Sequence, residues 1–583
     1  MTKKSEEKGN ANKPELWHAT SHVLADAVKR LWSNVKLGIG PAIDDGFYYD
    51  FDKKEPFKPE DLQKIEKEMQ KIISEKLDFK HVLIERKEAE KILKAEPYKL
   101  ELLKDIKDKK ISFYQHGKFM DLCAGPLAKN TKEIGAIKLL RTAGAYWKGD
   151  SSRPMLQRIY GISFQSANEL NLFIKQREEA EKRDHSKLGR ELDLYTTHPA
   201  IGKGLPLFTP KGTTIKMILQ RWIEDEEKKR GYLFTSTPIL AKTELYKISG
   251  HLDHYRDKMF IFKTPEGEEL ALRPMTCPYQ FMIYKSRQRS YKDLPIRYAE
   301  TATLCRYEQS GELHGLIRIW QFTLADAHII CMPSQIEEEF EKVLDLIQYI
   351  MKTLGFKDYW YRFSRWDPKD KEKYIDNPKA WKESETVLKK ILDKNKLKYE
   401  EVIGDAAFYG PKLDVQMKNV WGKEDTIFTI QIDFALPERF DMTYTDKDNK
   451  EARPMVIHRS SIGCYERTIA MLIEHYAGAF PVWLAPVQAK ILTLTDDNIK
   501  YAKKVEQQLK NANIRIETDY NATTVQLKIR NSQLEKVPYM LVIGEKEEKA
   551  GTLAVRTRDG KVKFGIKTED FIKEICKEIE EKR

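Results

Sequence analysis

The sequence predicts a multidomain protein of mixed α+β and α/β class, and three observations support this prediction. At 583 residues the chain is too long for one hydrophobic core, because single cores stop growing at about 250–300 residues. Helical and strand-like patterns mix between residue 14 and about residue 176. From about residue 489 onward strands and helices alternate, which is typical of a small α/β domain with a mainly parallel sheet.

The composition narrows the class of protein and its partners. Hydrophobic residues make up 41% of the chain and charged residues 33%, so the domains can bury cores and still present polar surfaces. The formal net charge of +12 favours a polyanionic partner. The N-terminal residues lack the apolar core of a signal peptide, and no apolar run reaches the ~18 residues of a membrane span. The six cysteines form no CxxC pair, which is typical of reduced thiols, so we expect a cytoplasmic protein without membrane segments.

The first predicted helix carries two histidines one turn apart. Residues 1–13 predict a disordered lead, and the stretch WHATSHVLADAVKRLW at 17–32 then shows an apolar helical stripe. His18 and His22 lie four positions apart, so they share one face of this helix. The spacing suits a metal pair, a pair of hydrolytic imidazoles or the polar edge of an amphipathic helix, and it does not by itself decide between them.

Changes in composition along the chain mark the domain boundaries. The lysine-rich stretch 53–110 predicts solvated helices, and the almost wholly charged stretch 176–191 predicts a connecting helix or linker. The next block contains an amphipathic helix at 213–230, and prolines within 480–490 mark its end. We therefore expect a disordered lead (1–13), an N-terminal domain (14–176), a linker helix (177–190), a central domain (191–485) and a C-terminal domain (486–583).

The C-terminal domain shows the clearest alternation. Its expected strands are AKILTLT (489–495), IRIETDY (514–520), YMLVIGE (539–545) and TLAVRTR (552–558). Its expected helices cover 497–512, 524–535 and 567–582. This order of elements predicts helices that connect the strands of one sheet.

The middle block lacks the common phosphate-binding loops but offers a different nucleotide clamp. Neither the P-loop GxxxxGK[ST] nor the GxGxxG turn occurs in the chain. An Arg-x-Glu pair on an expected strand, Arg306 and Glu308, precedes a glycine-containing loop, Arg318 and Phe322. Arginine binds phosphate oxygens through paired hydrogen bonds, and an aromatic ring can stack on a base. Arg467 opens a predicted helix and would close the clamp over a purine by cation–π contact.

Taken in order, these segments resemble the three signature motifs of class II aminoacyl-tRNA synthetases, and the whole chain is similar to the threonyl-tRNA synthetase family. The resemblance implies an antiparallel-sheet catalytic core, an N-terminal editing-type domain and a C-terminal anticodon-binding domain. It also implies ATP-dependent ligation of L-threonine to tRNA(Thr) by a homodimer with RGYLFTSTP (230–238) at its interface, and the ubiquitin-like first domain of many bacterial members is expected to be absent. The segments that carry the resemblance are WHATSHVL, GPAIDDGFYYD, DLCAGP, AGAYWKGDS, MLQRIYG, KRDHSKLGRELDLY, SGHLDHY, RPMTCP, SGELHGLIR, DAHI, AFYGPKLD, MVIHRSSIGCYERTIAMLIEHYAGAFPVWLAP and KVPYMLVIGEK.

The resemblance implies one zinc ion per subunit. Its ligands would be Cys277, His328 and His458, which stand in the matching motifs MTCP, DAHI and VIHR. One thiolate and two imidazoles suit Zn²⁺, and three protein ligands leave one coordination position open. The family uses this position for the amino group and hydroxyl of threonine. Valine has the shape of threonine without the hydroxyl, and a pocket built on shape alone would reject it poorly.

Further pocket residues follow from the same resemblance. Asp326 matches the acceptor for the threonine hydroxyl, and Tyr409 and Gln431 match residues that line the amino-acid pocket. Lys412 in YGPK would lie near the phosphates or the substrate carboxylate. His251 in SGHLDHY matches the histidine proposed to assist transfer of the threonyl group to the tRNA ribose.

The clamp residues take defined ATP-binding roles in this family. Arg306 and Arg318 would bind phosphate, and Phe322 would stack on adenine. Arg467 would lie over the opposite face of the base, and Glu308 would contact its edge. Mg²⁺ is expected to accompany the triphosphate. Attack of the threonine carboxylate on the α-phosphate would be catalysed mainly by positioning and charge stabilisation.

A second, hydrolytic site is physically expected, because a metal that selects a hydroxyl cannot reject serine. Serine lacks only a methyl group, which is worth about 1–3 kcal/mol in a pocket. The resemblance places an editing site for Ser-tRNA(Thr) at His18, His22, Asp121 and Cys123, where imidazole acid–base chemistry would orient water. The family pattern D-x-C-x-G-P-H reads DLCAGPL here, so Leu127 stands at a histidine position and editing is expected to be weak, rerouted or lost.

Two other departures and the tRNA contacts complete the expectations. Leu324 replaces a polar residue in FTLADAHII, and Cys464 stands where serine is usual, so threonine affinity is expected to change while activity survives. In the C-terminal domain Arg530, Glu547 and Arg556 are candidates for reading anticodon base edges, because their side chains offer matching donors and acceptors.

Other functions fit the sequence less well. A synthetase-like regulatory protein would be expected to lose motif arginines or metal ligands, and these are present. A stand-alone zinc hydrolase is disfavoured, because the chain has no HExxH glutamate and most of its length would be unexplained. A prolyl or seryl enzyme shares the three motifs, but the Cys/His/His set and the N-terminal domain favour threonine.

Overall fold

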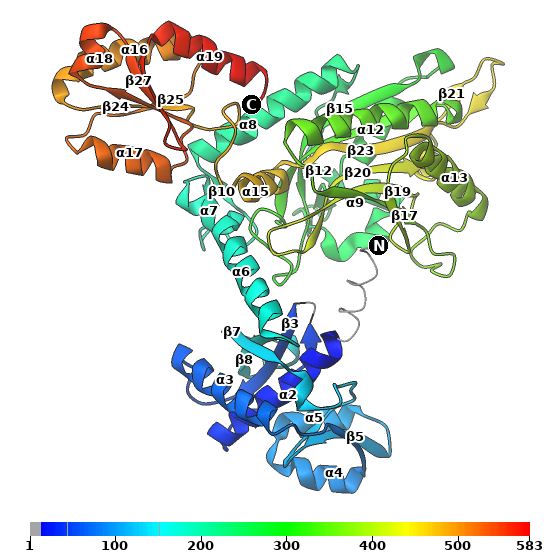
Figure 1. Cartoon of the computed structure of the whole chain (residues 1–583). Helices are drawn as coiled ribbons and strands as arrows, with labels where there is room; N and C mark the ends of the chain where they lie inside the picture. Colours follow the sequence, from blue (N-terminus) through cyan, green and yellow to red (C-terminus); the bar gives the residue numbers. More distant parts are fainter. Residues whose placement is uncertain (1–12, 44, 151) are drawn as a thin grey trace. The chain divides into compact units, whose positions relative to one another are not determined.

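The computed structural model describes residues 13–43, 45–150 and 152–583. They form two compact units, a small unit up to Glu178 and a large unit from Glu179 onward (Figure 1). No helix within the described ranges is long and apolar enough to cross a bilayer.

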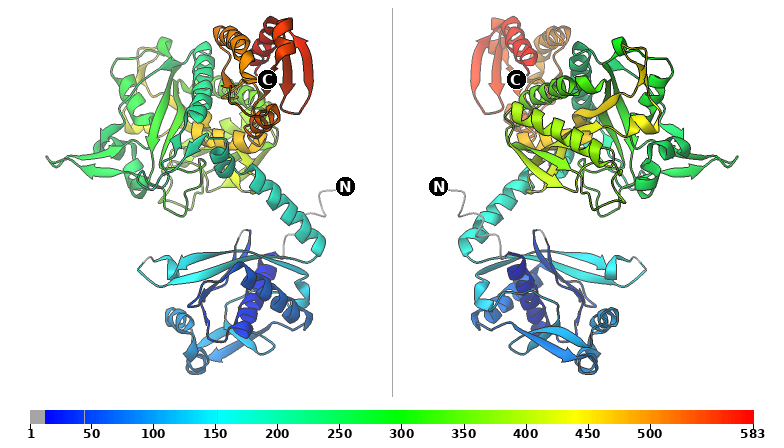
Figure 2. Two further views of the ribbon diagram at one scale, coloured as in Figure 1. Left: turned by 90° about the vertical axis from the view of Figure 1, so that its left-hand side faces the viewer. Right: turned by 90° about the vertical axis from the view of Figure 1, so that its right-hand side faces the viewer.

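A five-stranded antiparallel sheet forms the centre of the small unit. Its elements are α2 (Lys13–Leu31), β1 (Lys36–Leu37), β2 (Ala42–Ile43), β3 (Gly46–Asp52), β7 (Ala136–Tyr146) and β8 (Met155–Phe164). The strand order is β1–β3–β8–β7 with β2 beside β3, and β7 and β8 form a long hairpin (Figure 2). Helix α2 packs on β3 and β8 through buried residues such as Val23 and Ala27, as the apolar stripe predicted. The helix begins at Lys13, which corrects the end of the disordered lead expected at 1–13; residues 1–12 lie outside the described ranges.

The lysine-rich stretch 53–110 is only partly helical, so its prediction as solvated helices is wrong in two respects. Its neighbourhood comprises α3 (Pro59–Ser74), β4 (Lys80–Glu85), α4 (Arg86–Ile92), α5 (Pro97–Asp105), β5 (Lys110–His116) and β6 (Phe119–Leu122). Strand β4 interrupts the helices and pairs with β5, and its weak alternation of buried and exposed positions hid it in the sequence. Lys99 is only 3% exposed, because its ammonium group pairs with a buried carboxylate.

The charged connection predicted at 176–191 consists of two helices, α6 (Ala167–Arg183) and α7 (His185–Glu191). Asp184 separates them, and its carboxylate accepts hydrogen bonds from the backbone N–H groups two and three residues later, at 2.9 and 3.0 Å. This contact caps the N-terminus of α7. The connection is therefore a helix with one defined break.

An eight-stranded sheet forms the centre of the large unit (Figure 1). In sheet order its strands are β11 (Leu233–Phe234), β15 (Ile296–Cys305), β16 (Gln321–Cys331), β23 (Met455–Cys464), β20 (Glu424–Asp433), β19 (Lys412–Lys418), β17 (Tyr359–Arg365) and β18 (Tyr399–Ile403). Neighbours are antiparallel except at the two edges, where β11 is parallel to β15 and β18 to β17. The antiparallel core implied by the resemblance is thus confirmed.

Three helices pack on this sheet and share one apolar core with it. They are α8 (Pro210–Lys229), α12 (Ile336–Thr353) and α15 (Tyr465–Tyr476). The amphipathic pattern predicted the first of them at 213–230, close to its observed bounds. The remaining elements are β9 (Tyr195–Thr196), β10 (Leu207–Phe208), β12 (Leu240–Lys242), α9 (Thr243–Ser249), α10 (His251–Tyr255), β13 (Ile261–Lys263), β14 (Glu269–Leu272), α11 (Cys277–Lys285), α13 (Pro378–Lys394), α14 (Leu436–Arg439), β21 (Tyr444–Thr445) and β22 (Glu451–Ala452).

The pairing of β16 with β23 decides which side chains meet. His328 lies directly opposite His458 in this pairing. Successive side chains of a strand point to opposite faces, so Phe322, Leu324, Asp326 and His328 project from the same face of β16. The register therefore places Phe322, Asp326 and His328 of the predicted site along one line.

The C-terminal segment folds as the expected α/β domain, with one correction. Its elements are β24 (Ala489–Thr493), α16 (Ile499–Asn511), β25 (Ile516–Asp519), α17 (Val525–Leu534), β26 (Tyr539–Ile543), α18 (Glu545–Ala550), β27 (Leu553–Thr557), β28 (Val562–Ile566) and α19 (Thr568–Glu580). The sheet is mixed: β24 is parallel to β25 and β26, whereas β26–β27 and β27–β28 are antiparallel. The missed strand β28 follows β27 through a turn containing Asp559 and Gly560, and such a short hairpin forces antiparallel pairing. Helix α17 lies on one side of this sheet, and α16 and α19 lie together on the other (Figure 1).

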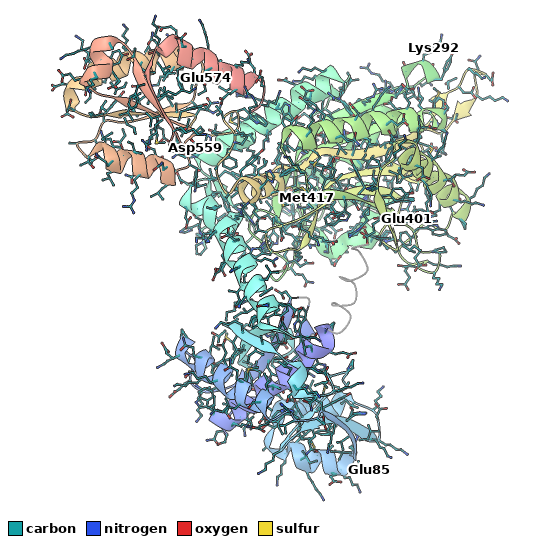
Figure 3. The ribbon with its side chains drawn as sticks, viewed as in Figure 1. Glu85, Lys292, Glu401, Met417, Asp559 and Glu574 are labelled. Atoms are coloured by element: carbon teal, nitrogen blue, oxygen red, sulfur yellow. The ribbon has the colours of Figure 1, made fainter. Side chains whose placement is uncertain are left out.

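Side-chain positions follow the burial expected of each element. Met417 on β19 is 6% exposed and packs in the core of the large sheet (Figure 3). The charged side chains labelled in the same view are exposed to solvent: Glu85, Lys292, Glu401, Asp559 and Glu574. Polar side chains that are buried despite this pattern are therefore the candidates for function.

Candidate active site and a second polar cluster

A cavity of about 570 Å³ opens on one face of the large sheet. This volume is typical of a site that encloses a small-molecule ligand. All the residues that the sequence assigned to the central domain line it: His251, Cys277, Arg306, Glu308, Arg318, Phe322, Asp326, His328, Tyr409, Lys412, Gln431, His458 and Arg467. The fold thus brings together residues that are widely separated in the sequence.

Three buried side chains in this cavity form a potential metal site. A ligand atom of Cys277, one of His328 and one of His458 all lie within 4.8 Å of one another. Cys277 begins α11, whereas the two histidines lie opposite each other on β16 and β23. Burial raises the pKa of the Cys277 thiol well above its ordinary value, so a thiolate there requires a nearby cation.

The partners of the two imidazoles leave one nitrogen of each ring free for a metal. Nδ1 of His328 lies 2.6 Å from Oε1 of Gln280, whose amide nitrogen in turn donates to Thr235. Nε2 of His458 lies 2.8 Å from a carboxylate oxygen of Asp433. Each acceptor fixes a proton on the nitrogen it faces, so the other nitrogen carries a lone pair. The donor set therefore fits a divalent metal.

The amino-acid end of the cavity is polar and buried. Asp326 accepts a hydrogen bond from the hydroxyl of Thr276, and burial raises the pKa of its carboxyl. The Tyr409 hydroxyl donates to Oε1 of Gln431 at 2.5 Å. The Tyr409 ring centroid lies 5.0 Å from that of His458, so these groups adjoin the potential metal site. Such a pocket can bind the polar groups of a small amino acid.

Arg306 lies in the loop that begins where β15 ends at Cys305, so the prediction of a strand at Arg306 and Glu308 is wrong. The Arg306 Nε atom donates to the carbonyl of Pro274 at 3.1 Å, which holds the side chain inside the cavity. Its guanidinium carbon lies 5.2 Å from the centroid of the Phe322 ring. Burial lowers the pKa of Arg306, and nearby Arg467 adds to this effect, so an anion at this position would relieve a strongly desolvated positive charge.

Arg467 lies in the first turn of α15, where the sequence predicted it would open a helix. Its Nε atom donates to the Ile317 carbonyl at 3.1 Å and its Nη1 atom to the Thr426 carbonyl at 2.7 Å. Arg318 forms a 3.0 Å ion pair with Glu308. This half of the cavity can bind a polyphosphate, because three arginines surround it.

The other two predicted residues of this cavity have local partners. His251 begins α10, and its Nδ1 atom lies 2.9 Å from the Ser249 hydroxyl. Burial lowers the pKa of His251 to about 3, so the ring is neutral near pH 7. Lys412 pairs with Asp414 at 2.9 Å and with Asp405 at 3.4 Å.

Sequence reasoning missed several polar residues of this site. Lys258 lies 3.6 Å from Glu308 and lines the cavity. Lys373 also lines it and donates to a backbone carbonyl. Gln280 and Asp433 orient the two histidines but carry no motif of their own. Only Gln280 had a signal, because it follows Cys277 by three positions on one helix and so shares its face.

The two departures from the family pattern are partners in the structure. Leu324 on β16 lies opposite Cys464 on β23, and both line the cavity. The Cys464 sulfur lies 3.3 Å from a carboxylate oxygen of Glu466. The same carboxylate pairs with Lys216 at 2.7 Å. The two positions are therefore neighbours across the β16–β23 pair.

The small unit brings its four predicted residues into a second cluster. Cys123 Sγ lies 3.3 Å from Nε2 of His18, and Nδ1 of His22 lies 3.2 Å from a carboxylate oxygen of Asp121. The two imidazole centroids are 5.2 Å apart. Leu127 adds no polar group to this cluster: its side chain is 8% exposed and packs in the same apolar core as Cys123.

Two buried residues in this cluster were not predicted. Lys99 Nζ lies 2.7 Å from one oxygen of Asp121, and the Tyr49 hydroxyl donates to the other at 2.6 Å. Burial alone would raise the pKa of Asp121, but Lys99 and His22 outweigh it and lower that pKa. Burial lowers the pKa of His22 and brings that of His18 to about 4, so both rings are neutral near pH 7. Lys99 gave no signal, because it lies in a stretch of many exposed lysines.

The three anticodon candidates lie on three different elements. Arg530 is exposed on α17, and Arg556 is partly buried on β27. Glu547 accepts a hydrogen bond from the backbone N–H of Gly544 at 3.1 Å, so its carboxylate caps α18. The structure thus gives Glu547 a local structural contact and leaves Arg530 accessible.

Family descriptions match all three parts of the chain. Residues 260–476 match the tRNA synthetase class II core domain (G, H, P, S and T). Residues 482–578 match an anticodon binding domain. Residues 111–160 match the threonyl and alanyl tRNA synthetase second additional domain.

Two related sequences and a solved structure show similarity to the same family. A threonine–tRNA ligase from Clostridium botulinum is 56% identical over 571 residues, covering 97% of this chain and 89% of that relative. One from Clostridium perfringens is 55% identical over 566 residues, covering 96% and 88%. The crystal structure of the RNA binding domain of threonyl-tRNA synthetase from Cryptosporidium parvum Iowa II has a TM-score of 0.64 and 36% identity, covering 68% of this chain and 98% of that one.

Proposed function

The chain belongs to the threonyl-tRNA synthetase family of ligases, and from this premise we propose how its two polar sites divide the work. The large cavity activates L-threonine with ATP and transfers it to tRNA(Thr), with zinc as the selecting metal. The cluster of the small unit hydrolyses Ser-tRNA(Thr). The observation that carries the first proposal is the convergence of three metal donors and three arginines on one cavity.

Cys277, His328 and His458 would hold the zinc ion. Support comes from the donor set and from Gln280 and Asp433, which leave one lone pair on each imidazole. When bound, the metal would coordinate the amino group and the hydroxyl of threonine, and valine has no hydroxyl to offer it. The buried polar groups beside it accept and orient the same substrate.

The arginines act on the triphosphate. Arg306 and Arg318 bind phosphate oxygens, and Arg467 covers the base that stacks on Phe322. Arg318 then exchanges its ion pair with Glu308 for a phosphate, and Glu308 becomes free to contact the adenine edge. Mg²⁺ accompanies ATP and neutralises part of its charge. Catalysis of adenylate formation comes mainly from this positioning and from charge stabilisation at the α-phosphate.

His251 assists the transfer step by orienting the ribose hydroxyl. A ring that is neutral near pH 7 can accept a hydrogen bond from this hydroxyl. A pKa of about 3 makes the ring a weak proton acceptor, so its contribution is alignment more than proton removal. Lys412, fixed by two carboxylates, contacts the substrate carboxylate or the phosphates.

The small unit edits with a cluster that lacks a histidine at position 127. Neutral His18 and His22 would orient a water molecule by hydrogen bonding more than remove its proton, because burial lowers the pKa of both rings; the Asp121 carboxylate lies beside Nδ1 of His22 at 3.2 Å. The Leu127 side chain packs in the core, so the remaining groups must suffice. Cys123 completes the polar wall beside His18.

Two assembly proposals accompany the chemistry. Leu233 and Phe234 on the edge strand β11 are 58% and 36% exposed, and we propose that the segment 230–238 forms a homodimer interface. The C-terminal domain contacts the anticodon, with Arg530 as its accessible candidate. Replacing Leu233→Asp should convert a dimer to a monomer in analytical ultracentrifugation.

Threonylation of tRNA(Thr) and release of serine from Ser-tRNA(Thr) test the division of work. The wild type should show both activities and about one zinc per chain by elemental analysis. A His18→Ala/His22→Ala variant should lose serine release and keep threonylation. Serine release at the uncatalysed rate in the wild type would contradict the editing proposal, and a protein that charges threonine after zinc is removed would contradict the metal proposal.

A further inference from the structure

A buried histidine at the start of α7 joins two elements of the ATP-binding half of the cavity. His185 is 0% exposed. Its Nδ1 atom lies 2.6 Å from Oε1 of Glu474, and its Nε2 atom lies 3.2 Å from the backbone nitrogen of Leu316. A backbone N–H only donates, so Nε2 is the acceptor and the ring proton sits on Nδ1, where it is donated to the carboxylate. One imidazole therefore bridges helix α15 and the loop that follows β15.

Each end of this bridge adjoins an arginine of the ATP site. Glu474 follows Arg467 by two helical turns on α15, so both project from a similar face. Leu316 precedes Ile317, whose carbonyl accepts the 3.1 Å hydrogen bond from Nε of Arg467. Arg318 is the next residue along the same loop. The position of His185 thus bears on both Arg318 and Arg467.

The loop backbone lies directly against the imidazole. Gly315 has a φ of +48°, and a Cβ atom at this position would overlap with Nε2 of His185. The second oxygen of Glu474 accepts from the backbone nitrogen of Val420 at 3.0 Å, which fixes the carboxylate from its other side. Asp184 caps α7 and also accepts from the indole nitrogen of Trp421 at 3.0 Å. The ring is therefore held from both sides.

A metal is not the best occupant of this cluster, although Asp184, His185 and Glu474 stand close enough to hold one. Both nitrogens of the ring already have protein partners, so His185 offers no lone pair to an ion. The cluster is better suited to fixing a loop than to binding a ligand.

We propose that His185 is a positioning residue for ATP: it docks the loop 306–320 on α15 so that Arg318 and Arg467 face the same nucleotide. The inference rests on the proposed function, because it takes these two arginines as ATP ligands. The expected signature is a loss of ATP affinity without a loss of threonine affinity, since the metal donors and Asp326 lie on other elements.

Two substitutions separate the two hydrogen bonds of the ring. His185→Asn keeps a donor at the position of Nδ1 and loses the acceptor for Leu316, so the KM for ATP should rise roughly tenfold. His185→Gln places an acceptor near the position of Nε2, so the KM for ATP should stay within about threefold of the wild type. Both are measured by ATP–pyrophosphate exchange with ATP or threonine varied, and by thermal unfolding.

A third substitution tests the contact without changing the histidine. Gly315→Ala pushes the exposed loop away from the ring and should raise the KM for ATP as His185→Asn does. Lys187→Gln, on the exposed side of the same helix, is the matched control and should change neither KM.

Three outcomes decide the proposal. A rise in the ATP KM for His185→Asn and Gly315→Ala, with rescue in His185→Gln and a constant threonine KM, supports it. Equal rises in both KM values, or equal behaviour of the Asn and Gln variants, would reduce His185 to a packing residue and overturn it. Arg467→Ala run in parallel separates the two levels: if it leaves the ATP KM unchanged, the proposed ATP site itself is wrong.

Discussion

The two units each hold two histidines and a cysteine within metal-binding distance, yet their surroundings differ. In the large unit the potential metal ligands come from α11, β16 and β23. Their two imidazoles hydrogen-bond to a neutral amide and to a carboxylate. In the small unit both histidines lie on one helix, and the carboxylate behind them is paired with the buried ammonium group of Lys99.

The two clusters also differ in the charge that lies beside them. A cation beside Cys277 would gain from the negative charge of Asp433, which faces His458, and from the thiolate that the cation stabilises. A cation beside Cys123 would meet the positive charge of Lys99, which already satisfies Asp121. Residue type alone therefore does not define a metal site; the partners of the ligands do. The same three residue types can therefore favour a cation in one place and disfavour it in another.

The largest effect on activity should come from removing one of the potential metal-binding side chains of the large cavity. Cys277→Ser should abolish bound metal and lower threonylation roughly a thousandfold, because a metal supplies several kcal/mol of binding and orientation. Elemental analysis and ATP–pyrophosphate exchange measure the two effects. Cys576→Ser is the matched control. If Cys123→Ser also removed one equivalent of metal, the contrast between the two clusters would collapse.

Asp121→Asn should destabilise the small unit by about 3–5 kcal/mol, because it leaves the Lys99 ammonium group buried without a counter-charge. Serine release from Ser-tRNA(Thr) should be lost and threonylation kept. Calorimetric unfolding of the full chain measures the stability. Adding Lys99→Met should recover a large part of the loss; a double variant no more stable than the single one would mean that the ion pair is not the cause.

Asp433→Asn should weaken the metal rather than remove it. The amide contributes no charge, and its NH2 group would face either His458 or the backbone N–H groups of Ala435 and Leu436, from all of which the carboxylate accepts; changes of this kind lower metal affinity by about 10–100-fold. Competition with a chromogenic chelator measures the affinity. An unchanged affinity would show that the charge behind the ligand is not what distinguishes the two clusters.

Leu127→His should raise serine release only a few-fold, because an added imidazole supplements a cluster that already has two. Its cost is the burial of a polar group in the apolar core, about 1–3 kcal/mol. Single-turnover hydrolysis and thermal unfolding measure both effects. Leu127→Met is the control for the volume change and should leave hydrolysis unaltered. A rise of more than a hundredfold would mean that the wild-type site is nearly inactive.

The smallest expected effect is that of pH on editing. Burial lowers the pKa of His18 to about 4, so the neutral ring persists throughout the range from about pH 6 to 8. The enzymatic rate, corrected for uncatalysed ester hydrolysis, should change less than about twofold in that range and fall as the pH drops toward 4. A steep rise centred near pH 6.5 would show that the histidines titrate as exposed groups do.

Site residues could be predicted from the sequence where they stand in a short recognisable motif. Cys277, His328 and His458 each stand in a recognisable string, and the pairing of β16 with β23 brings two of them together. The C-terminal α/β domain was predictable because its strands and helices alternate. The strand β28 and helix α18 were missed because neither has a fully buried residue, so neither shows an apolar pattern in the sequence.

The residues that could not be predicted owe their roles to burial. In the sequence Lys99 resembles the other lysines of an exposed helix, but the fold buries its side chain. Asp433 acts through a hydrogen bond to His458, which lies 25 residues away in the chain. The packing of Leu127 likewise depends on tertiary contacts, because the sequence shows only that a histidine is missing. Local patterns report local structure, whereas electrostatic partners are set by the whole fold.

Strand β16 sets the spacing of several side chains that line the cavity. Its side chains at 322, 324, 326 and 328 face the cavity in steps of two residues, so they span about 20 Å from Phe322 to His328. Losing or gaining one residue between them would turn every later side chain to the opposite face of the sheet. Substitutions can therefore change individual side chains of β16, as Leu324 illustrates, but the spacing between these side chains is fixed.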